Sequence, residues 1–412
     1  MHNVIKILMK NKAIKWYSIC CCLLLLIYNA FNNNIYDVFN YTFSVVIPFI
    51  CLLCSIWIIN KDIYKPKIFC ISLILFCILS VLSFTTDNIF LLYAYMEMSF
   101  IPMCIMIFSY EKDYDLKIIY QYLFYTLISA IFILIGIIEI YNDTKSVLLS
   151  EIYRIGVKSN FPLYMLALGT AIKLPIFPFY YWVPSVHGKS PGVCSVLLSS
   201  IVLKFSSLIL VKIICPLFNM CSYKYIGYYV SFGMLISVCQ MMYKKDLKTV
   251  FAYSSVIHMG LYTFILLAGN NVKYFTYSIL QHTITMTLSF LVLDLLKNNY
   301  KHLAFNKLIL TNKHELILLF INTLIIIDFP FTWGFIAETI SIFSVIQCDL
   351  ITTSIVGLAL LLYNSYFVYI IFNIFRNSII DSVNRINILY TVVICILIIP
   401  ILLFGIAPKL FI

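Results

Sequence analysis

Charged residues are scarce in this sequence. Asp, Glu, Lys and Arg make up 11% of its 412 residues, whereas hydrophobic residues make up 63% and the mean hydropathy is +1.00. A soluble globular domain carries roughly 25% charged residues. The composition therefore excludes a soluble domain of this length and predicts an all-α polytopic membrane protein.

Sequence motifs that bind cofactors are also missing. The sequence has no G-x-G-x-x-G, no P-loop and no two CxxC pairs at metal-ligand spacing. It has 14 cysteines, but most lie in apolar runs, as Cys20, Cys51 and Cys54 do, which is typical of small buried hydrophobic residues. We expect this chain to bind no nucleotide, metal or haem itself.

Apolar segments long enough to cross a bilayer fill most of the chain. A span needs about 20 residues, and the connections between segments are short, so we expect one transmembrane domain over residues 1–412. The thirteen predicted spans are 16–30, 41–60, 67–85, 88–109, 117–141, 161–179, 192–215, 225–243, 247–268, 273–296, 315–345, 351–375 and 386–407.

The net charge of +11 is unevenly distributed. If the N-terminus lies inside and the spans alternate, 19 of the 28 Lys and Arg residues fall in inside loops, 6 fall outside, and Lys173, Lys204 and Lys212 lie within spans. This asymmetry fits the positive-inside rule and not a nucleic-acid-binding surface. The basic N-terminus lacks a small-residue cleavage site, so we expect no removable signal.

The stretch from Lys173 to Lys204 combines buried charge with a broken helix. Pro175 and Pro178 follow Lys173 directly and should end its helix. Inserting a lysine into hydrocarbon costs about 2.5–3.5 kcal/mol on insertion scales, so each such lysine must have a partner or a function. Lys212, nearer a helix end, fits a side chain that reaches the interface. Lys173 and Lys204 fit this alternative badly and are candidate proton carriers.

Glu97 is the isolated ionisable residue of the fourth predicted span. It could be a neutral carboxylic acid that is hydrogen-bonded to a neighbouring helix. We favour an ion pair with Lys173, because charged groups inside a membrane usually pair. The protonation of two such partners would be coupled.

Two histidines lie in polar stretches of the ninth and tenth spans. Ser255 and His258 share a helix face, and His282 lies beside Gln281 and Thr283. Imidazole titrates near neutral pH and suits a proton shuttle. The alternative for each histidine is a structural hydrogen bond.

The eleventh span is interrupted at Pro330 and Gly334, between Asp328 and Glu338. A charge, a proline break and a resumed apolar run repeat the pattern at Lys173. Two interrupted helices in separate halves favour an inverted-repeat transporter. We expect N-terminal scaffold helices over 1–87, a first antiporter-like repeat over 88–243, and a second repeat with the C-terminal helices over 246–412.

Five motifs between Tyr93 and Thr339, some 60% of the chain, resemble one family: the subunit 4 family of the antiporter-like membrane subunits of respiratory complex I. The motifs are Y-M-E-M-S-F-I-P-M, A-I-K-L-P-I-F-P-F-Y-Y-W-V-P-S-V-H, I-V-L-K-F, D-L-K-T-V-F-A-Y-S-S-V-I-H-M and F-P-F-T-W-G-F-I-A-E-T. The last is similar to the family's G-x-P-G-T-x-N-F-x-G-E-F. Two departures stand out: the family's H-V-E-A-P is H-G-K-S-P here, with Lys189 in place of Glu, and the Asn and a Gly of the last motif are Gly334 and Ala337.

The resemblance implies a proton path. Glu97 and Lys173 would be a coupled charge pair, and Lys204 the central proton-carrying lysine. His258 and His282 would belong to a hydrated polar axis, and Glu338 would pass the proton on at its far end.

The resemblance also implies a setting. NADH, FMN, iron–sulfur clusters and ubiquinone would be bound by partner subunits, and the neighbours would be the antiporter-like subunits 2 and 5 and lipids. The membrane would be the mitochondrial inner membrane, with the N-terminus on the matrix side. A subunit of a multi-chain Na+/H+ antiporter, a sister subunit (2 or 5) and a purely structural membrane subunit remain as alternatives.

Overall fold

The computed structural model describes residues 2–31, 37–112, 116–218, 224–269, 271–300, 303–379 and 387–408. Side chains 2–13, 31, 224, 268–269 and 348 are not described. Within these ranges the chain is helical, with two isolated β-bridges and no β-strand. The all-α fold class predicted from the composition is confirmed.

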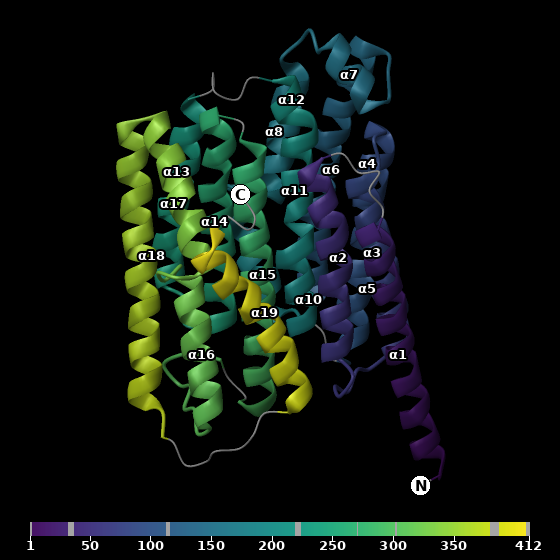
Figure 1. The fold of residues 1–412 in the computed structure, drawn as a ribbon, viewed down its shortest axis with the longest axis vertical. Helices are drawn as coiled ribbons and strands as arrows, with labels where there is room; N and C mark the ends of the chain where they lie inside the picture. The colour runs from purple at the N-terminus through teal and green to yellow at the C-terminus, as the bar shows by residue number, and fades with distance from the viewer. Residues whose placement is uncertain are drawn as a thin grey trace. The chain divides into compact units, whose positions relative to one another are not determined.

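The chain divides into two compact units, each described by itself. Unit 1 comprises residues Met1–Thr170 and Leu208–Leu217. In unit 1, α1 packs against α2 and α3, and α3 packs against α4 and α5 (Figure 1). Its elements are α1 (His2–Phe31), α2 (Val38–Trp57), α3 (Pro66–Thr85), α4 (Ile89–Met98), α5 (Phe100–Tyr110), α6 (Leu116–Thr144), α7 (Leu149–Ile155), most of α8 (Phe161–Lys173), η3 (Leu210–Ile214) and α12 (Cys215–Leu217).

Unit 2 comprises Ala171–Ser207 and Phe218–Ile412. Its core is α14, which packs against α9, α13, α15 and α17. Its elements are η1 (Phe179–Tyr181), α9 (Trp182–Lys189), α10 (Gly192–Leu197), η2 (Leu198–Val202), the start of α11 (Lys204–Ile209), α13 (Lys224–Met242), α14 (Leu247–Gly269), α15 (Val272–Asn299), α16 (Lys313–Ile326), α17 (Trp333–Cys348), α18 (Leu350–Asn377) and α19 (Ile388–Ile406).

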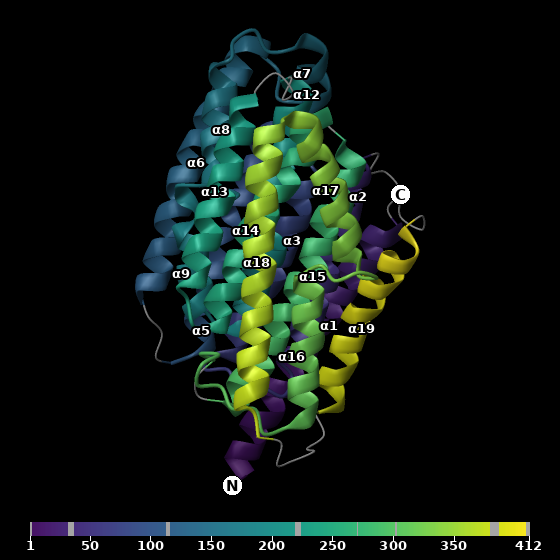
Figure 2. The ribbon, with the colours of Figure 1, turned by 90° about the vertical axis from the view of Figure 1, so that its left-hand side faces the viewer.

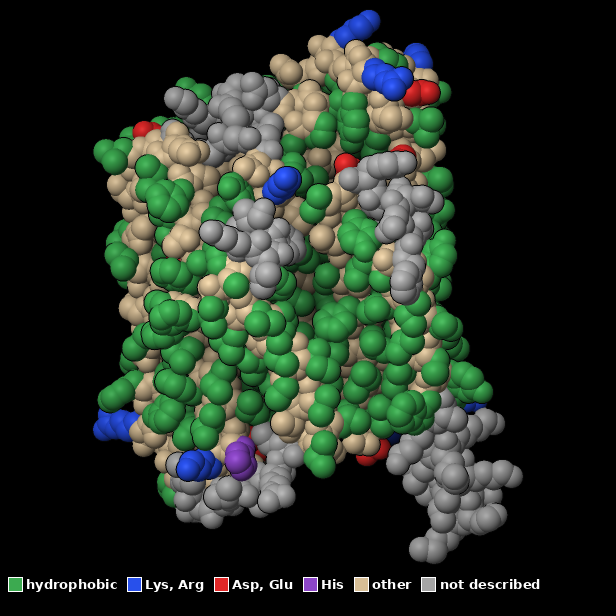
Figure 3. Space-filling model, in the orientation of Figure 1, with side chains coloured by type: hydrophobic (Ala, Val, Ile, Leu, Met, Phe, Trp, Pro, Cys, Tyr) green, Lys and Arg blue, Asp and Glu red, His purple; other side chains and the backbone are tan. Residues whose placement is uncertain are grey.

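Each predicted span coincides with one helix or with a run of consecutive helical segments. Ten described helices are long and apolar enough to cross a membrane, and Ile14–Ala30, Phe161–Lys173 and Trp333–Gln347 are shorter apolar helices. On the face in Figure 3, hydrophobic side chains cover the middle of the helices, and the visible charged side chains lie near helix ends. The two units follow packing and do not coincide with the predicted repeats, whose bounds stay predictions.

Both predicted helix breaks are present. In the first, α8 ends at Lys173, and the indole of Trp182 donates to the carbonyl of Ile172 at 3.0 Å. In the second, α16 ends at Ile326 and α17 begins at Trp333, one helix above the other in Figure 2. There the Tyr363 hydroxyl donates to the carbonyl of Ile326 at 3.0 Å. Each break therefore frees carbonyls that a side chain of another segment binds.

Short polar residues start several of the spanning helices. Asn88, Asn271 and Asn312 accept hydrogen bonds from the first amides of α4, α15 and α16. Asp246 does the same for α14, because its carboxylate accepts from the Thr249 amide at 3.2 Å. Asp246 therefore caps the start of α14.

The structure shows what the Lys212 side chain binds. Lys212 is 4% exposed. The ammonium donates to the carbonyls of Phe84 and Thr86 at 2.8 and 2.9 Å, at the C-terminal end of α3. A cation there binds free carbonyls and opposes the negative end of the helix dipole. The ammonium thus lies at the end of a spanning helix, and its acceptors there are protein carbonyls.

Lys212→Met should therefore destabilise unit 1. Hydrogen bonds to a charged group contribute about 1.5–3 kcal/mol, and the variant leaves the α3 carbonyls without this donor. Thermal unfolding of the purified protein in lipid nanodiscs measures the loss. Lys67→Met, at an exposed lysine of α3, is the matched control and should change the unfolding temperature little. Equal melting of the two variants would contradict the capping role.

Candidate functional site

The Lys204 ammonium lies in the interior of unit 2. Its side chain is 0% exposed. Nζ lies 2.7 Å from His282 Nδ1 on α15, 3.1 Å from the Ser199 carbonyl, and 3.7 Å from the Met259 sulfur on α14. Ser199 belongs to η2, a π-helical turn directly before the lysine. Such turns loosen the helical ladder and are frequent at functional sites.

The contact between Lys204 and His282 joins two groups that can exchange a proton. An ammonium donates to a neutral imidazole nitrogen, or an amine accepts from a protonated one. At 2.7 Å the two facing atoms share one proton, because two protonated nitrogens would repel each other. The protonation of Lys204 and His282 is therefore coupled.

His258 is the next titratable group along this line. Its ring centroid lies 6.1 Å from that of His282, with the rings at 74°. Among the described residues, His282 Nε2 and Ser255 Oγ have no hydrogen-bond partner. A buried polar atom without a partner is costly, so both atoms favour a bridging water. Ser255 and His258, for which the sequence predicts a shared polar face, both lie within α14.

Asp328 lies beyond His258, at the break between α16 and α17. Its Oδ2 lies 3.3 Å from His258 Nε2, an ion-pair distance when the imidazole is protonated. Its Oδ1 accepts from Gln281 Nε2 at 3.3 Å. The Gln281 carbonyl oxygen in turn accepts from the Tyr262 hydroxyl at 2.8 Å. Sequence reasoning had assigned Asp328 no role.

The structure thus brings three of the six predicted site residues into one line: Lys204, His282 and His258. Glu338 is half-buried on α17 and interacts electrostatically with Asp328. Lys173 is 3% exposed, at the last residue of α8. Glu97 is half-buried in the last turn of α4, before an interruption at Ser99. Glu97 belongs to unit 1 and Lys173 to unit 2, so their pairing stays a prediction.

Two further buried polar residues near the loop that follows α9 were not singled out from the sequence. Lys248 is 2% exposed, and its ammonium donates to the Ser190 carbonyl. Asp294 on α15 is 4% exposed and lies against Gly192, at the start of α10. Neither residue stood out in the sequence, because both lie near the ends of predicted spans.

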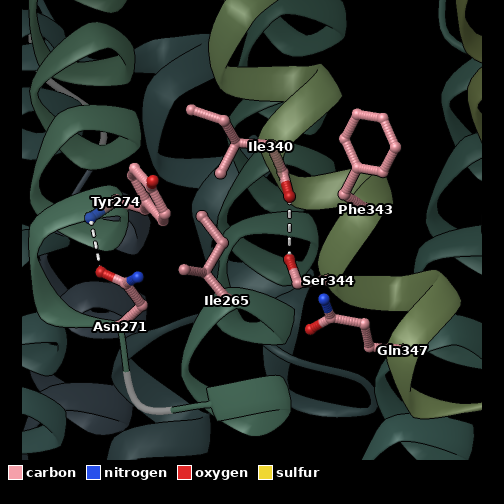
Figure 4. Close-up of a pocket in the computed structure, with 7 residues that line it drawn as sticks. All are labelled: Ile265, Asn271, Tyr274, Ile340, Phe343, Ser344 and Gln347. Carbon is pink, nitrogen blue, oxygen red and sulfur yellow. Dashed lines mark hydrogen bonds between the residues drawn. The ribbon is translucent and has the colours of Figure 1, made fainter. Parts of the chain in front are cut away.

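A hollow of about 340 Å³ opens elsewhere in unit 2. Its described lining comes from Ile265 of α14, Asn271 and Tyr274 at the start of α15, and α17 (Figure 4). This lining contains no Asp, Glu, Lys, Arg or His and none of the predicted site residues. The hollow therefore does not belong to the line of titratable groups.

A family described as "NADH:quinone oxidoreductase/Mrp antiporter, TM" matches residues 86–362, which include all six predicted site residues. The chain belongs to this family. The match confirms the resemblance drawn from the motifs and covers both interrupted helices.

Named relatives agree with the family. The chain is 27% identical to "NADH-quinone oxidoreductase subunit M" of Rickettsia typhi, over 78% of this chain and 67% of the relative. It is 28% identical to "NADH-ubiquinone oxidoreductase chain 4" of Acanthamoeba castellanii, over 70% of this chain and 60% of the relative. In the solved respiratory complex I from Thermus thermophilus, one chain matches with a TM-score of 0.82 at 17% identity, covering 91% of this chain and 82% of that one. This last likeness confirms the antiporter-like fold.

A substitution at Gly334 tests whether the Asp328 carboxylate is held in this position. A Cβ at this position would lie 1.6 Å from Asp328 Oδ1 and 2.8 Å from Gln281 Nε2. Gly334→Ala should therefore displace the carboxylate and destabilise the protein by about 1–3 kcal/mol, as overpacking does. Thermal unfolding in nanodiscs measures the effect.

Gly357→Ala on α18 is the matched control. A Cβ there meets no atom within 4 Å, so the change should be neutral or slightly stabilising. A Gly334→Ala protein that melts at the temperature of the control would show that Asp328 is not held in this position.

Proposed function

We propose that this chain is subunit 4, a proton-translocating membrane subunit of mitochondrial NADH:ubiquinone oxidoreductase. The observation that carries the proposal is the contact between Lys204 and His282 inside apolar helices, continued by His258. A lone structural lysine needs acceptors only, whereas this one faces a group that can take its proton. The family match and the named relatives support the same enzyme complex.

The geometry permits transfer along the line. With the Lys204 ammonium donating to Nδ1, the His282 ring carries its own proton on Nε2. When Nδ1 accepts the lysine proton, Nε2 can release its proton towards His258 through a water. One proton thus passes through the imidazole, which leaves Lys204 neutral and the remaining proton of His282 on Nδ1. The ring must turn or exchange protons again before Lys204 is reloaded.

The energies involved are of a suitable size. Moving one charge against 100 mV takes about 2.3 kcal/mol. Making or breaking one hydrogen bond to a charged group changes the free energy by about 1.5–3 kcal/mol. A small movement that lengthens the Lys204–His282 contact can therefore change proton affinity enough to drive release.

The redox chemistry belongs to partner subunits in this proposal. They would bind NADH, FMN, iron–sulfur clusters and ubiquinone, and antiporter-like subunits 2 and 5 would be the neighbours. Glu97 and Lys173 would transmit the redox signal to Lys204 as a coupled pair. We place the chain in the mitochondrial inner membrane with its N-terminus on the matrix side, because the basic loops predict that orientation.

A subunit of a multi-chain Na+/H+ antiporter is the second candidate, because the family description also includes Mrp antiporters. Such a complex would need no NADH. Purification of the native complex separates the two functions: co-purifying flavin and iron–sulfur subunits support the first, and only small antiporter subunits support the second.

Lys204→Met should lower proton translocation by about tenfold or more, because it removes the group that carries the proton. Methionine keeps the length of the side chain and cannot be protonated. Acidification by the assembled complex in proteoliposomes, driven by NADH and a quinone, measures the rate. Lys189→Met, at an exposed lysine, should translocate at the wild-type rate. Wild-type translocation by Lys204→Met would reject the role.

Glu97 and Lys173 are tested by a double-mutant cycle on the same assay. If they form a coupled pair, Glu97→Gln and Lys173→Met should each lower translocation, and the double variant should be little worse than either single variant. Independent residues would give additive losses in free energy instead, which would exclude the pair.

A further inference from the structure

We propose that Asp328 is a further proton-carrying residue of this path, placed between His258 and Glu338. The inference rests on the proposed function. It adds a carboxyl group at a position where the family motif quoted above has glycine.

The contacts of Asp328 are those of a proton acceptor and not of a helix cap. Oδ2 faces His258 Nε2 at 3.3 Å, and Oδ1 accepts from Gln281 at 3.3 Å. Gln281 is itself oriented by Tyr262 and by Thr285, whose Oγ accepts from Gln281 Nε2 at 3.0 Å. The carboxyl is 4% exposed, so these groups, and not solvent, decide its charge state.

The backbone at Asp328 shows that this placement is specific. Asp328 has φ 52, in the left-handed region that favours glycine. Aspartate tolerates this region better than most residues, yet it is uncommon there. Left-handed residues cluster at functional sites, where the surrounding structure holds them. Here the turn aims the side chain back towards α14 and α15, where His258 and Gln281 lie.

Gly334 explains how the carboxylate fits. Asp328 Oδ1 lies 1.6 Å from the point where a Cβ of residue 334 would be. The family motif has asparagine at this position and glycine at that of Asp328, so this chain has exchanged the two. In this chain the polar side chain comes from residue 328, and it is a carboxyl that can bind a proton.

The transfer step is a simple proton exchange. A protonated His258 gives its Nε2 proton to Asp328 Oδ2, which leaves a neutral imidazole and a neutral carboxylic acid, and no electron moves. Asp328 lies at the start of the second helix break, and Glu338 lies on α17, which begins after that break. In this proposal Glu338 is the next acceptor of the proton that Asp328 holds.

The test compares variants that keep the shape but remove the proton site. Asp328→Asn keeps side-chain size and an oxygen acceptor, and the Asp328→Gly/Gly334→Asn double variant puts an amide in the same space. We expect both to assemble, and both to lower NADH-driven proton translocation in proteoliposomes about tenfold or more. NADH oxidation with an artificial electron acceptor should stay unchanged.

Glu315→Gln is the matched control, because Glu315 is a buried carboxylate of α16 whose oxygen accepts from Asn299 at 2.6 Å, away from the line. It should translocate like the wild type. Wild-type translocation by Asp328→Asn or by the double variant, with Lys204→Met impaired in parallel, would overturn the role of Asp328 and show that it only fills the place of the asparagine. Wild-type translocation by Lys204→Met would instead reject the proposed function.

Discussion

A lysine ammonium within hydrocarbon must find its acceptors inside the protein, and the architecture of unit 2 depends on this constraint. Lys204 obtains them from three places: the carbonyl of Ser199 in its own π-helical turn, Met259 on α14 and His282 on α15. Removing one partner of a buried charge typically costs about 3–5 kcal/mol. Lys204 therefore links its own helix to both α14 and α15 through contacts that an apolar side chain would not make. The acceptor that satisfies it is also titratable, so the same contact that stabilises the fold can move a proton.

The same constraint shapes the interrupted helices. A broken helix leaves carbonyls that lipid cannot bind. Each break or helix end treated above has a side chain that binds one: Trp182 at the end of α8, Tyr363 at the end of α16 and Lys212 at the end of α3. Tyr363 also packs edge-on against the ring of His258, with centroids 5.3 Å apart. The residue that stabilises the second break thus also fixes the histidine that faces Asp328, so the break and the polar line are parts of one arrangement.

The sequence predicted the features that the bilayer constrains directly, such as span length and buried charge. Run length predicted the spans, prolines predicted both breaks, an isolated charge singled out Lys204 and a polar stretch singled out His282. The sequence was less informative where a side chain finds a buried partner far along the chain. No sequence rule shows that the end of α3 lies beside Lys212. Asp328 remained unassigned because its placement depends on a left-handed turn that aims a carboxylate away from its own helix. The pairing of Glu97 with Lys173 stays a prediction.

The position of Asp328 shows that a residue next to a motif position in space can carry a polar group that the motif position lacks. A motif compared letter by letter records the loss of the asparagine at Gly334 and suggests a weakened site. In the structure, Asp328 Oδ1 lies 1.6 Å from the point where a Cβ of residue 334 would be, so a carboxyl group is present beside this position. Near the loop that follows α9, Lys189 replaces the glutamate of the family motif and its side chain is exposed. The carboxylate of Asp294 on α15 lies against Gly192, three residues further along the chain. Because electrostatic interactions depend on distance and burial and not on sequence position, a departure from a motif counts as a loss of chemistry only when the neighbours in space do not supply it.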